Sequence, residues 1–193
     1  MIDLNDPTAL ALLASSSLAE AGIEHALYGG LLLASFGEPR ETRDADLAVN
    51  VPGSVAMREA LSARGLVAVT TFEDVRFGGL LLSRVTVFGG GAVGLNTVDL
   101  VRPASDRYAR EVQVRAINVT LREQAIRVVT PEDFVLLKLL STRERDLDDA
   151  ASVLRRGGAR LDLNQVVHGA GTLAIENPGH PVLARLAAVR QRA

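Results

Sequence analysis

The sequence predicts an α/β fold of the α+β type: a mixed β-sheet core with flanking helices and a small C-terminal helical region. Two observations predict this class. Up to residue 129, apolar runs of strand length alternate with helical segments, and several strand-like runs are direct neighbours in the chain. From residue 130 onward, the pattern is helical throughout. We therefore expect a core over residues 1–129 and a helical region over residues 130–193 that packs on this core.

Length and composition restrict the class of protein further. The 193 residues are 48% hydrophobic, which is enough for one core with a small appendage. A net charge of −2 gives no overall basic field, so nucleic-acid binding would need a local patch. The chain has 0 cysteines, which excludes disulfides and thiolate metal sites. No apolar run approaches the roughly 18 residues of a membrane span, and no basic signal segment opens the chain, so we expect a cytoplasmic protein that does not bind membranes.

Local signals at their ends define the first elements. Asp6 and Pro7 have the pattern of a helix cap and a first helical position, and Gly22 has that of a helix end. Ser54 is expected to cap a later helix, which Gly65 ends. The elements predicted over this part are a first helix ending before Gly22, a strand at 23–28, a short helix at 31–36, a strand at 44–51 and a helix at 54–64.

The middle of the chain is rich in β-branched residues and glycine turns. We expect one strand at 66–72 and a longer one at 75–88 that bends at Gly78-Gly79. The glycine-rich segment 89–92 is expected to be a hairpin turn rather than a phosphate loop, because neither a Lys-Ser/Thr pair nor a helix follows it. The remaining elements predicted here are a strand at 96–101, a helix at 105–112 and extended segments at 114–121 and 126–129.

The helical region has a strong start signal. Thr130 and Pro131 form a cap followed by proline at the first helical position, and acidic residues occupy the first turn. Asp146 is expected to cap the next helix, with Asp149 as its partner in a capping box. The helices predicted after the first one lie at 146–156, 162–168 and 181–192.

Two carboxylates in the predicted strand at 44–51 are the strongest functional signal. Asp44 and Asp46 are two residues apart, so both point to the same face of a strand, and Leu47 and Val49 occupy the opposite face. Adjacent carboxylates repel one another unless a cation lies between them. A pair of divalent metal ions about 3.5–4 Å apart is a common solution, and it serves phosphoryl and nucleotidyl transfer. Taken alone, an Asp-x-Asp pair is more often a solvated pair on a loop or edge strand.

Three further features accompany this pair. Gly29-Gly30 follows a short apolar run and opens a helical segment, although two glycines by themselves are more often a plain turn. Asp99 lies within the strand at 96–101 and points away from the face of its neighbours. Lys138 is the only lysine among 21 basic residues, which indicates a position that requires a compact ammonium group. The alternative for Lys138 is a side chain that extends from an apolar helix to solvent.

In their order and spacing, these residues resemble the nucleotidyltransferase superfamily with the DNA polymerase β-like core. The resemblance rests on Gly29-Gly30, on Arg40-x-Thr42-x-Asp44-x-Asp46-Leu47 and on a single later acid, Asp99. The branch that looks most similar is the abortive-infection type, the toxins of type IV toxin–antitoxin systems. That branch adds a helical segment similar to Thr130-Pro131-Glu132-Asp133, Lys138 and Arg143-x-Arg145-Asp146-x-x-Asp149 here.

The resemblance implies a mixed-sheet nucleotidyltransferase core that uses an NTP as donor. Asp44, Asp46 and Asp99 would be catalytic and would hold Mg²⁺, with Mn²⁺ as the alternative ion. Asp99 would also help to deprotonate the acceptor hydroxyl. The residues implied to bind the NTP are Gly29, Gly30, Arg40, Thr42, Arg43, Lys138 and Asp146.

We therefore expect an enzyme that transfers NMP from an NTP to a hydroxyl acceptor. The acceptor stays open between RNA such as tRNA, a protein side chain and a small molecule such as an aminoglycoside antibiotic. By resemblance alone, the first choice is a toxin that acts beside a cognate antitoxin protein. The alternative from another class is a non-catalytic module of the same fold that binds an NTP or a protein partner. Such a module would be expected to lose one of Asp44, Asp46 and Asp99, and all three are present.

Overall fold

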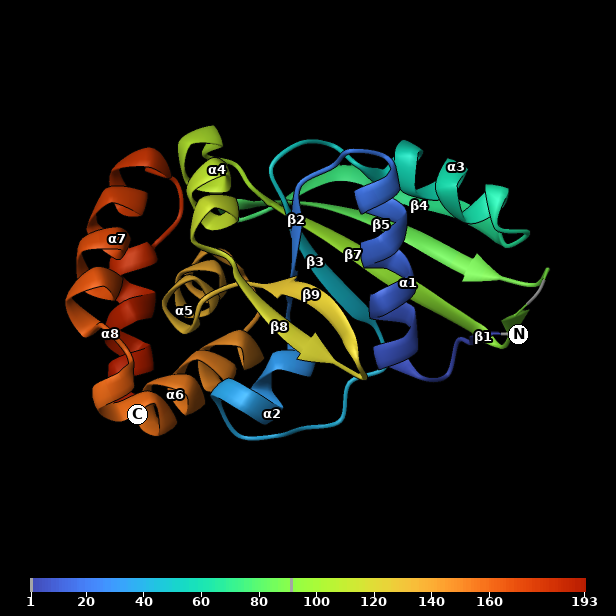
Figure 1. Ribbon diagram of the computed structural model, residues 1–193. Helices are drawn as coiled ribbons and strands as arrows, with labels where there is room; N and C mark the ends of the chain where they lie inside the picture. The colour runs from blue at the N-terminus through green and yellow to red at the C-terminus, as the bar shows by residue number, and fades with distance from the viewer. Residues whose placement is uncertain (1, 91) are drawn as a thin grey trace.

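The centre of the fold is a seven-stranded mixed β-sheet (Figure 1). The structure is a computed structural model that describes residues 2–90 and 92–193. The strand order is β4-β5-β7-β3-β2-β9-β8, with parallel pairs at β7–β3 and β2–β9 and antiparallel pairs elsewhere, which confirms the mixed sheet. The strands of this sheet are β2 (His25–Tyr28), β3 (Ala45–Val49), β4 (Val67–Phe77), β5 (Leu80–Phe88), β7 (Leu95–Pro103), β8 (Ile117–Leu121) and β9 (Gln124–Val128). A separate parallel pair joins β1 (Ile2–Asp3) to β6 (Ala92–Val93).

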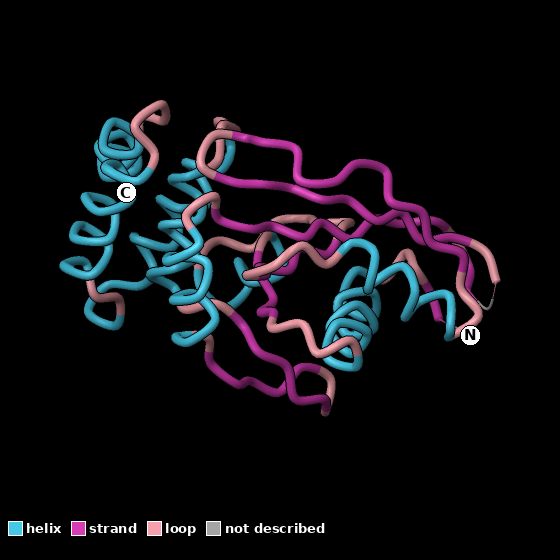
Figure 2. Tube along the Cα trace, turned by 90° about the horizontal axis from the view of Figure 1, so that it is seen from above, coloured by secondary structure: helices cyan, strands magenta, loops and turns pink. Residues whose placement is uncertain are grey.

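Helices pack along the sheet and gather at one of its ends. The views in Figures 1 and 2 place α1 and α3 beside the strands, and the helices that follow residue 130 cluster at the end of the sheet remote from the N-terminus. The helices are α1 (Pro7–Glu20), α2 (Leu33–Phe36), α3 (Ser54–Ala63), α4 (Asp106–Arg115), α5 (Pro131–Leu140), α6 (Arg145–Gly157), α7 (Leu163–Glu176) and α8 (Val182–Arg192), with 3₁₀ turns η1 (Gly30–Leu32) and η2 (Gly158–Arg160). Within residues 2–90 and 92–193, no helix combines the length and the apolar character that a membrane crossing requires.

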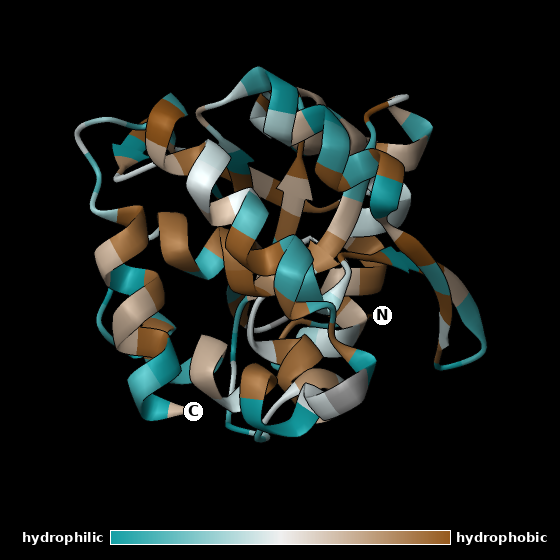
Figure 3. Ribbon diagram, turned by 90° about the vertical axis from the view of Figure 1, so that its left-hand side faces the viewer, coloured by the Kyte–Doolittle hydropathy of each residue, from teal (hydrophilic) through white to brown (hydrophobic). Residues whose placement is uncertain are grey.

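One hydrophobic core includes residues of the sheet and of the C-terminal helices. Its members are mostly Leu, Val and Ala, as an aromatic content of 4% requires. Figure 3 shows hydrophobic residues along the central strands and a mixture of hydrophobic and hydrophilic residues along the helices. Helix α5 is notable for its burial, because its residues from Glu132 to Leu140 are all buried, the polar ones included. The rings of Tyr28 and Phe134, whose centroids are 5.5 Å apart, connect β2 to this helix.

The two strongest helix-start signals are confirmed. The Asp6 carboxylate accepts hydrogen bonds from the backbone N–H groups of Thr8 and Ala9, at 3.0 and 3.2 Å, and Pro7 opens α1. The Thr130 hydroxyl accepts one from the backbone N–H of Asp133 at 3.1 Å, and Pro131 opens α5. Both caps pair donors that the first helical turn would otherwise leave without a partner.

The expected bend at Gly78-Gly79 is wrong, because the chain reverses there. Phe77 pairs with Leu80, so the two glycines form a two-residue hairpin loop between β4 and β5, and Gly78 has φ of +66°. The single strand expected at 75–88 is therefore the end of β4 followed by β5. Asp74, with φ of +47°, lies where the β4–β5 register shifts. The expected turn at 89–92 lies partly outside the described residues, which include Gly89 and Gly90 but not residue 91.

Three helix predictions also need correction. Ser54 is not a cap: Gly53 holds the cap position of α3, and the Ser54 hydroxyl donates instead to the Glu73 carboxylate. The helix expected at 105–112 continues to 115, so the following strand starts only at 117. The helix expected at 162–168 continues to 176. Gly169 does not end it but lies inside α7 against Leu136, where a Cβ would lie 2.7 Å from a methyl carbon.

Candidate active site

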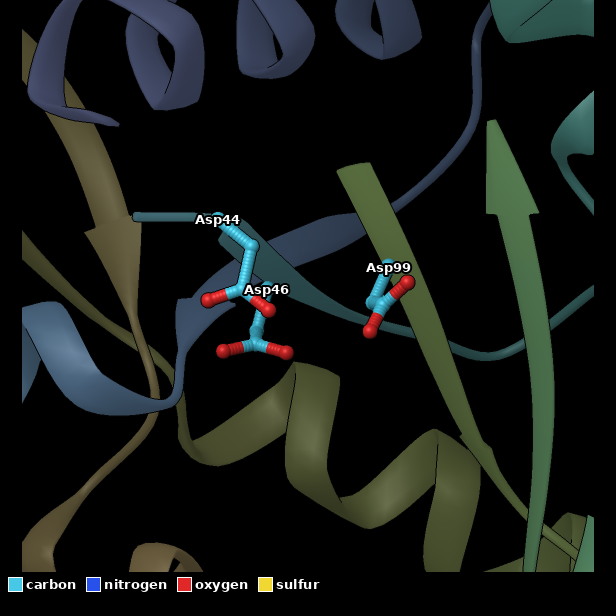
Figure 4. Close-up of side chains that lie close together, drawn as sticks. All are labelled: Asp44, Asp46 and Asp99. Carbon is cyan, nitrogen blue, oxygen red and sulfur yellow. The ribbon is translucent and has the colours of Figure 1, made fainter. Parts of the chain in front are cut away.

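Three carboxylates converge on two neighbouring strands. Asp46 on β3 and Asp99 on β7 are register partners in the parallel pair, and Asp44 directly precedes β3. One carboxylate oxygen from each residue lies within 4.8 Å of those from the other two. Figure 4 shows Asp44 and Asp46 side by side, with Asp99 beside them on the adjacent strand. We call these residues the carboxylate triad. The β3–β7 register places Asp99 beside Asp46, and Asp44 lies one residue before β3.

The backbone of Gly29-Gly30 packs directly on this site. Gly29 follows β2 with φ of +82° and ψ of −155°, and a Cβ on it would lie 1.9 Å from Asp46 Oδ2. A Cβ on Gly30 would lie 2.8 Å from Thr42 Oγ1. The absence of side chains at both positions is therefore what lets Asp46 and Thr42 occupy their places.

The carboxylate triad concentrates negative charge. Burial, followed by repulsion from Asp99 and Asp44, raises the pKa of Asp46 from 3.8 to about 7, although Lys138 and Arg143 act in the opposite direction. Thr42 Oγ1 donates a hydrogen bond to Asp44 Oδ1 at 3.1 Å. Among the side chains that the structure describes, none donates a hydrogen bond to Asp46. A set of oxygen donors that repel one another at this distance fits a hard divalent cation such as Mg²⁺ or Mn²⁺.

Asp99 has a partner that the sequence did not reveal. Arg84 on β5 is its register partner in the antiparallel pair, and its Nε and Nη2 each donate to one Asp99 oxygen at 2.7 Å. The guanidinium also lies over the Phe72 ring, 5.6 Å from its centroid. Asp99 itself is 1% exposed. The signal for Arg84 was its position in a strand beside the one that carries Asp99, but only the β5–β7 register shows that the two residues are opposite.

Lys138 lies in a buried ionic cluster. Its Nζ donates to Asp146 Oδ1 at 2.5 Å and to Asp149 Oδ2 at 2.9 Å, and it lies 5.5 Å from the centroid of the Tyr28 ring. The residue is 2% exposed, so the alternative of a side chain that extends to solvent is wrong. Burial alone would raise the pKa of Asp146, but Lys138 and then Arg143 outweigh it and lower the pKa to about 2.

The expected capping roles of Asp146 and Asp149 are also wrong. Glu144 holds the cap position of α6, and both aspartates face the interior instead. Asp149 accepts hydrogen bonds from Arg40 as well as from Lys138. The Nε and Nη2 of Arg40 donate to its two oxygens at 2.9 and 3.0 Å. Arg40 therefore connects the loop before β3 to helix α6.

The remaining predicted residues lie at the edge of the site. Arg43 is largely exposed and pairs with Glu41 at 3.3 Å. Arg143 is exposed, and its Nε donates to Asp146 Oδ2 at 3.0 Å. Arg143 also lines the cavity that Asp99 lines.

Two cavities flank the carboxylate triad. The one beside Asp99 has a volume of about 280 Å³ and mainly apolar walls, and its lining includes Tyr28, Phe72, Phe77, Leu80, Arg84 and Arg143. The one beside Asp44 has a volume of about 330 Å³ and mainly polar walls, and its lining includes Arg40, Thr42, Arg43, Asn96, Thr97 and Arg145. The site can therefore receive two ligand groups of different polarity, one beside Asp99 and the other beside Asp44.

Comparisons with known proteins agree with this fold. No protein-family model and no curated protein matches the sequence. Among solved structures, the chain is similar to an antigenic nucleotidyltransferase-like protein from Paracoccidioides brasiliensis, with 17% identity, a TM-score of 0.54, and 96% of this chain and 92% of that chain covered. It is also similar to JHP933 from Helicobacter pylori, with 12% identity, a TM-score of 0.52, and 98% and 89% covered. The fold is nucleotidyltransferase-like, and at these identities the likeness extends to the fold alone.

Proposed function

We propose that this chain is a divalent-metal-dependent nucleotidyltransferase, which transfers NMP from an NTP to a hydroxyl acceptor. The observation that carries the proposal is the carboxylate triad, formed where Asp46 and Asp99 are register partners on β3 and β7. The nucleotidyltransferase-like fold supports it. Neighbouring carboxylates that repel one another, with Asp99 buried and Asp44 and Asp46 partly buried, are costly to a fold unless a cation compensates them, so the arrangement favours a metal-binding role over a structural one.

The proposed chemistry assigns a role to each acid. Asp44, Asp46 and Asp99 would hold Mg²⁺, or Mn²⁺ in its place, and the bound ion supplies positive charge to the triphosphate. Asp99 accepts the proton of the acceptor hydroxyl. The hydroxyl oxygen then forms a bond to the α-phosphorus, the bond from that phosphorus to the bridging oxygen breaks, and pyrophosphate leaves. The protein contributes position and electrostatic stabilisation.

The polar cavity beside Asp44 suits the triphosphate. We propose that Arg40, Thr42 and Arg43, which line this cavity, contact the triphosphate, since the two arginines supply positive charge beside Asp44. Gly29 and Gly30 are buried against Asp46 and Thr42, so we propose that they serve the nucleotide site by leaving room for these two side chains. Lys138 lies over the Tyr28 ring and donates to Asp146 in the ionic cluster. We propose that these two residues support the nucleotide site from within the cluster.

The charge around the site bears on the acceptor. The two cavities are lined by the arginines Arg40, Arg43, Arg84, Arg143 and Arg145. Four of these arginines pair with carboxylates, but the two linings together hold five arginines and three acids (Glu41, Asp44 and Asp99). This small excess of positive charge favours the phosphates of an RNA acceptor over a polycationic acceptor such as an aminoglycoside. We therefore place RNA, tRNA included, before a protein side chain or an antibiotic. A toxin role beside an antitoxin protein, in the cytoplasm where NTPs are abundant, rests on the motif resemblance.

The test is transfer of label from each of the four α-³²P NTPs with Mg²⁺. Total RNA, a protein mixture and aminoglycosides are offered as separate acceptors, and the matched variants are Asp46→Asn and Asp148→Asn. Asp148 is a solvent-exposed carboxylate on α6 that pairs with Arg192. We expect the wild type and Asp148→Asn to label RNA. In Asp46→Asn, the rate of transfer should fall at least about 100-fold. Full activity in Asp46→Asn would overturn the proposal. Binding of an NTP without transfer to any acceptor would favour the non-catalytic module.

A further inference from the structure

Arg84 and Asp99 form a pair whose geometry is fixed by three elements. Their register pairing on β5 and β7 puts both side chains on the same face of the sheet. Both Asp99 oxygens are engaged, each at 2.7 Å from a guanidinium nitrogen. The guanidinium also lies over the Phe72 ring of β4. This is the bidentate arrangement in which an arginine binds a carboxylate most strongly.

The other two members of the carboxylate triad are compensated much less. Asp44 receives a neutral hydroxyl donor, Thr42, at 3.1 Å. Asp46 receives no hydrogen bond from any side chain in residues 2–90 and 92–193. The uncompensated negative charge is therefore concentrated at Asp44 and Asp46, and that is where a first divalent cation gains the most attraction.

A second cation at Asp99 would face a different environment. It would have to bind an oxygen that already accepts from Arg84, close to a guanidinium that keeps its positive charge. The side chain of Arg84 is 34% exposed and lines the cavity beside Asp99, so a ligand in that cavity can contact it. Its position is held by Asp99 and by the Phe72 ring. Like charges at such a short distance disfavour the second ion until a further negative group arrives.

We propose, on the basis of the proposed function, that Arg84 is a positioning residue that serves as the fixed cation at Asp99. The protein without nucleotide then holds a single divalent ion, bound by Asp44 and Asp46. The negative charge needed to admit a second ion comes with the triphosphate.

The test counts Mn²⁺ ions bound to the nucleotide-free protein at low ionic strength, from the signal of free Mn²⁺ in electron paramagnetic resonance. The wild type is expected to bind one ion per chain. Arg84→Gln, which keeps hydrogen-bonding capacity but loses the charge, is expected to bind a second ion at least about tenfold more tightly than the wild type does. Arg84→Lys, which keeps the charge, is expected to remain at one ion. Arg122→Gln, which removes an exposed arginine paired with Asp6, serves as the control for net charge.

The outcomes separate this inference from the proposed function. Two ions of similar affinity in the wild type, or a single ion in Arg84→Gln, would overturn the role of Arg84. If the wild-type ion persists unchanged in Asp46→Asn, the carboxylate triad is not the metal site, and the proposed function fails with it. A thermal melt of each variant shows that it is folded, and the first Mn²⁺ ion provides a second check because Arg84→Gln leaves Asp44 and Asp46 in place.

Discussion

The α-carbon of Gly29 packs directly against the side chain of Asp46. A Cβ at residue 29 would lie 1.9 Å from Asp46 Oδ2 and 2.6 Å from its Cγ, and both distances are far below van der Waals contact. The backbone at Gly29, with φ of +82° and ψ of −155°, is also in a region that essentially only glycine adopts. Gly29 is therefore required by two independent constraints, one conformational and one steric, and the second concerns a member of the carboxylate triad.

Gly29→Ala should damage both the fold and the metal site. Backbone strain costs on the order of 1–3 kcal/mol of the free energy of unfolding, and the clash forces Asp46 to move. We expect the Mn²⁺ affinity to fall at least about tenfold. Urea unfolding and a Mn²⁺ titration measure the two effects.

The matched control for this variant is Gly171→Ala. Gly171 lies within α7, and a Cβ there meets open space. This substitution should raise the free energy of unfolding by about 0.5–1 kcal/mol, because alanine restricts the unfolded chain and is the better helix former. A Gly29→Ala protein with wild-type Mn²⁺ affinity would show that Asp46 does not depend on this packing.

The raised pKa of Asp46 predicts how stability depends on pH. Folding raises this pKa from 3.8 to about 7, so between these values the folded protein holds a proton that the unfolded chain has lost. The free energy of unfolding should therefore fall as pH rises from about 4 through 7, with a slope of at most about 1.4 kcal/mol per pH unit from this group. Chelator-treated protein measured at intervals from pH 5 to 8 provides the test, and Asp46→Asn should lack this component.

Other acids titrate in a separate pH range. The pKa values of Asp146 and Asp149 lie below the ordinary value for aspartate, so the stability they provide is lost only in acid, below about pH 4. Mn²⁺ binding should weaken as pH falls below 7, since a proton competes for Asp46. Identical pH profiles of wild type and Asp46→Asn between pH 5 and 8 would contradict the raised pKa.

The sequence was sufficient for features that depend on neighbours in the chain. The strand period predicted that Asp44 and Asp46 lie together, and their carboxylates do so although Asp44 stands one residue before β3. The caps at Asp6 and Thr130 follow from residue type and spacing. The mixed sheet followed from strand-like runs with helices between them. These signals act over a few residues, so an isolated sequence carries them in full.

Features that depend on register or on distant partners could not be predicted in this way. Arg84 meets Asp99 only because of the β5–β7 register, and Lys138 meets Asp149 only because α5 and α6 pack together. At Asp146, the local sequence signal and the distant partner favour different roles. Its sequence position suits a helix cap, but a buried lysine offers a stronger partner than a backbone N–H group, and the cap position of α6 is Glu144, two residues earlier.

Lys138→Met should be strongly destabilising. It leaves Asp146 and Asp149 buried without the ammonium group that they share. Arg143 still donates to Asp146, and Arg40 still donates to Asp149. Breaking a buried ionic cluster on one side typically costs about 3–5 kcal/mol, and urea unfolding measures this loss. Arg192→Gln is the control, because that arginine pairs with Glu144 and Asp148 at the surface and its loss should leave the urea midpoint unchanged. Equal midpoints for both variants would show that the buried cluster contributes no more than a surface pair.

The boundary expected at residue 130 should not separate two independently stable units. Phe134 packs on Tyr28 of β2, and helix α5 is buried along its length within a hydrophobic core shared with the sheet. A fragment of residues 1–129 would expose this apolar surface and should lack a cooperative unfolding transition. Far-UV circular dichroism during urea unfolding tests the fragment beside the full chain, for which we expect one transition. A cooperative transition in the fragment would mean that the sheet and helices α1 to α4 suffice for a stable core, and that residues 130–193 serve the ionic cluster and the site rather than the fold.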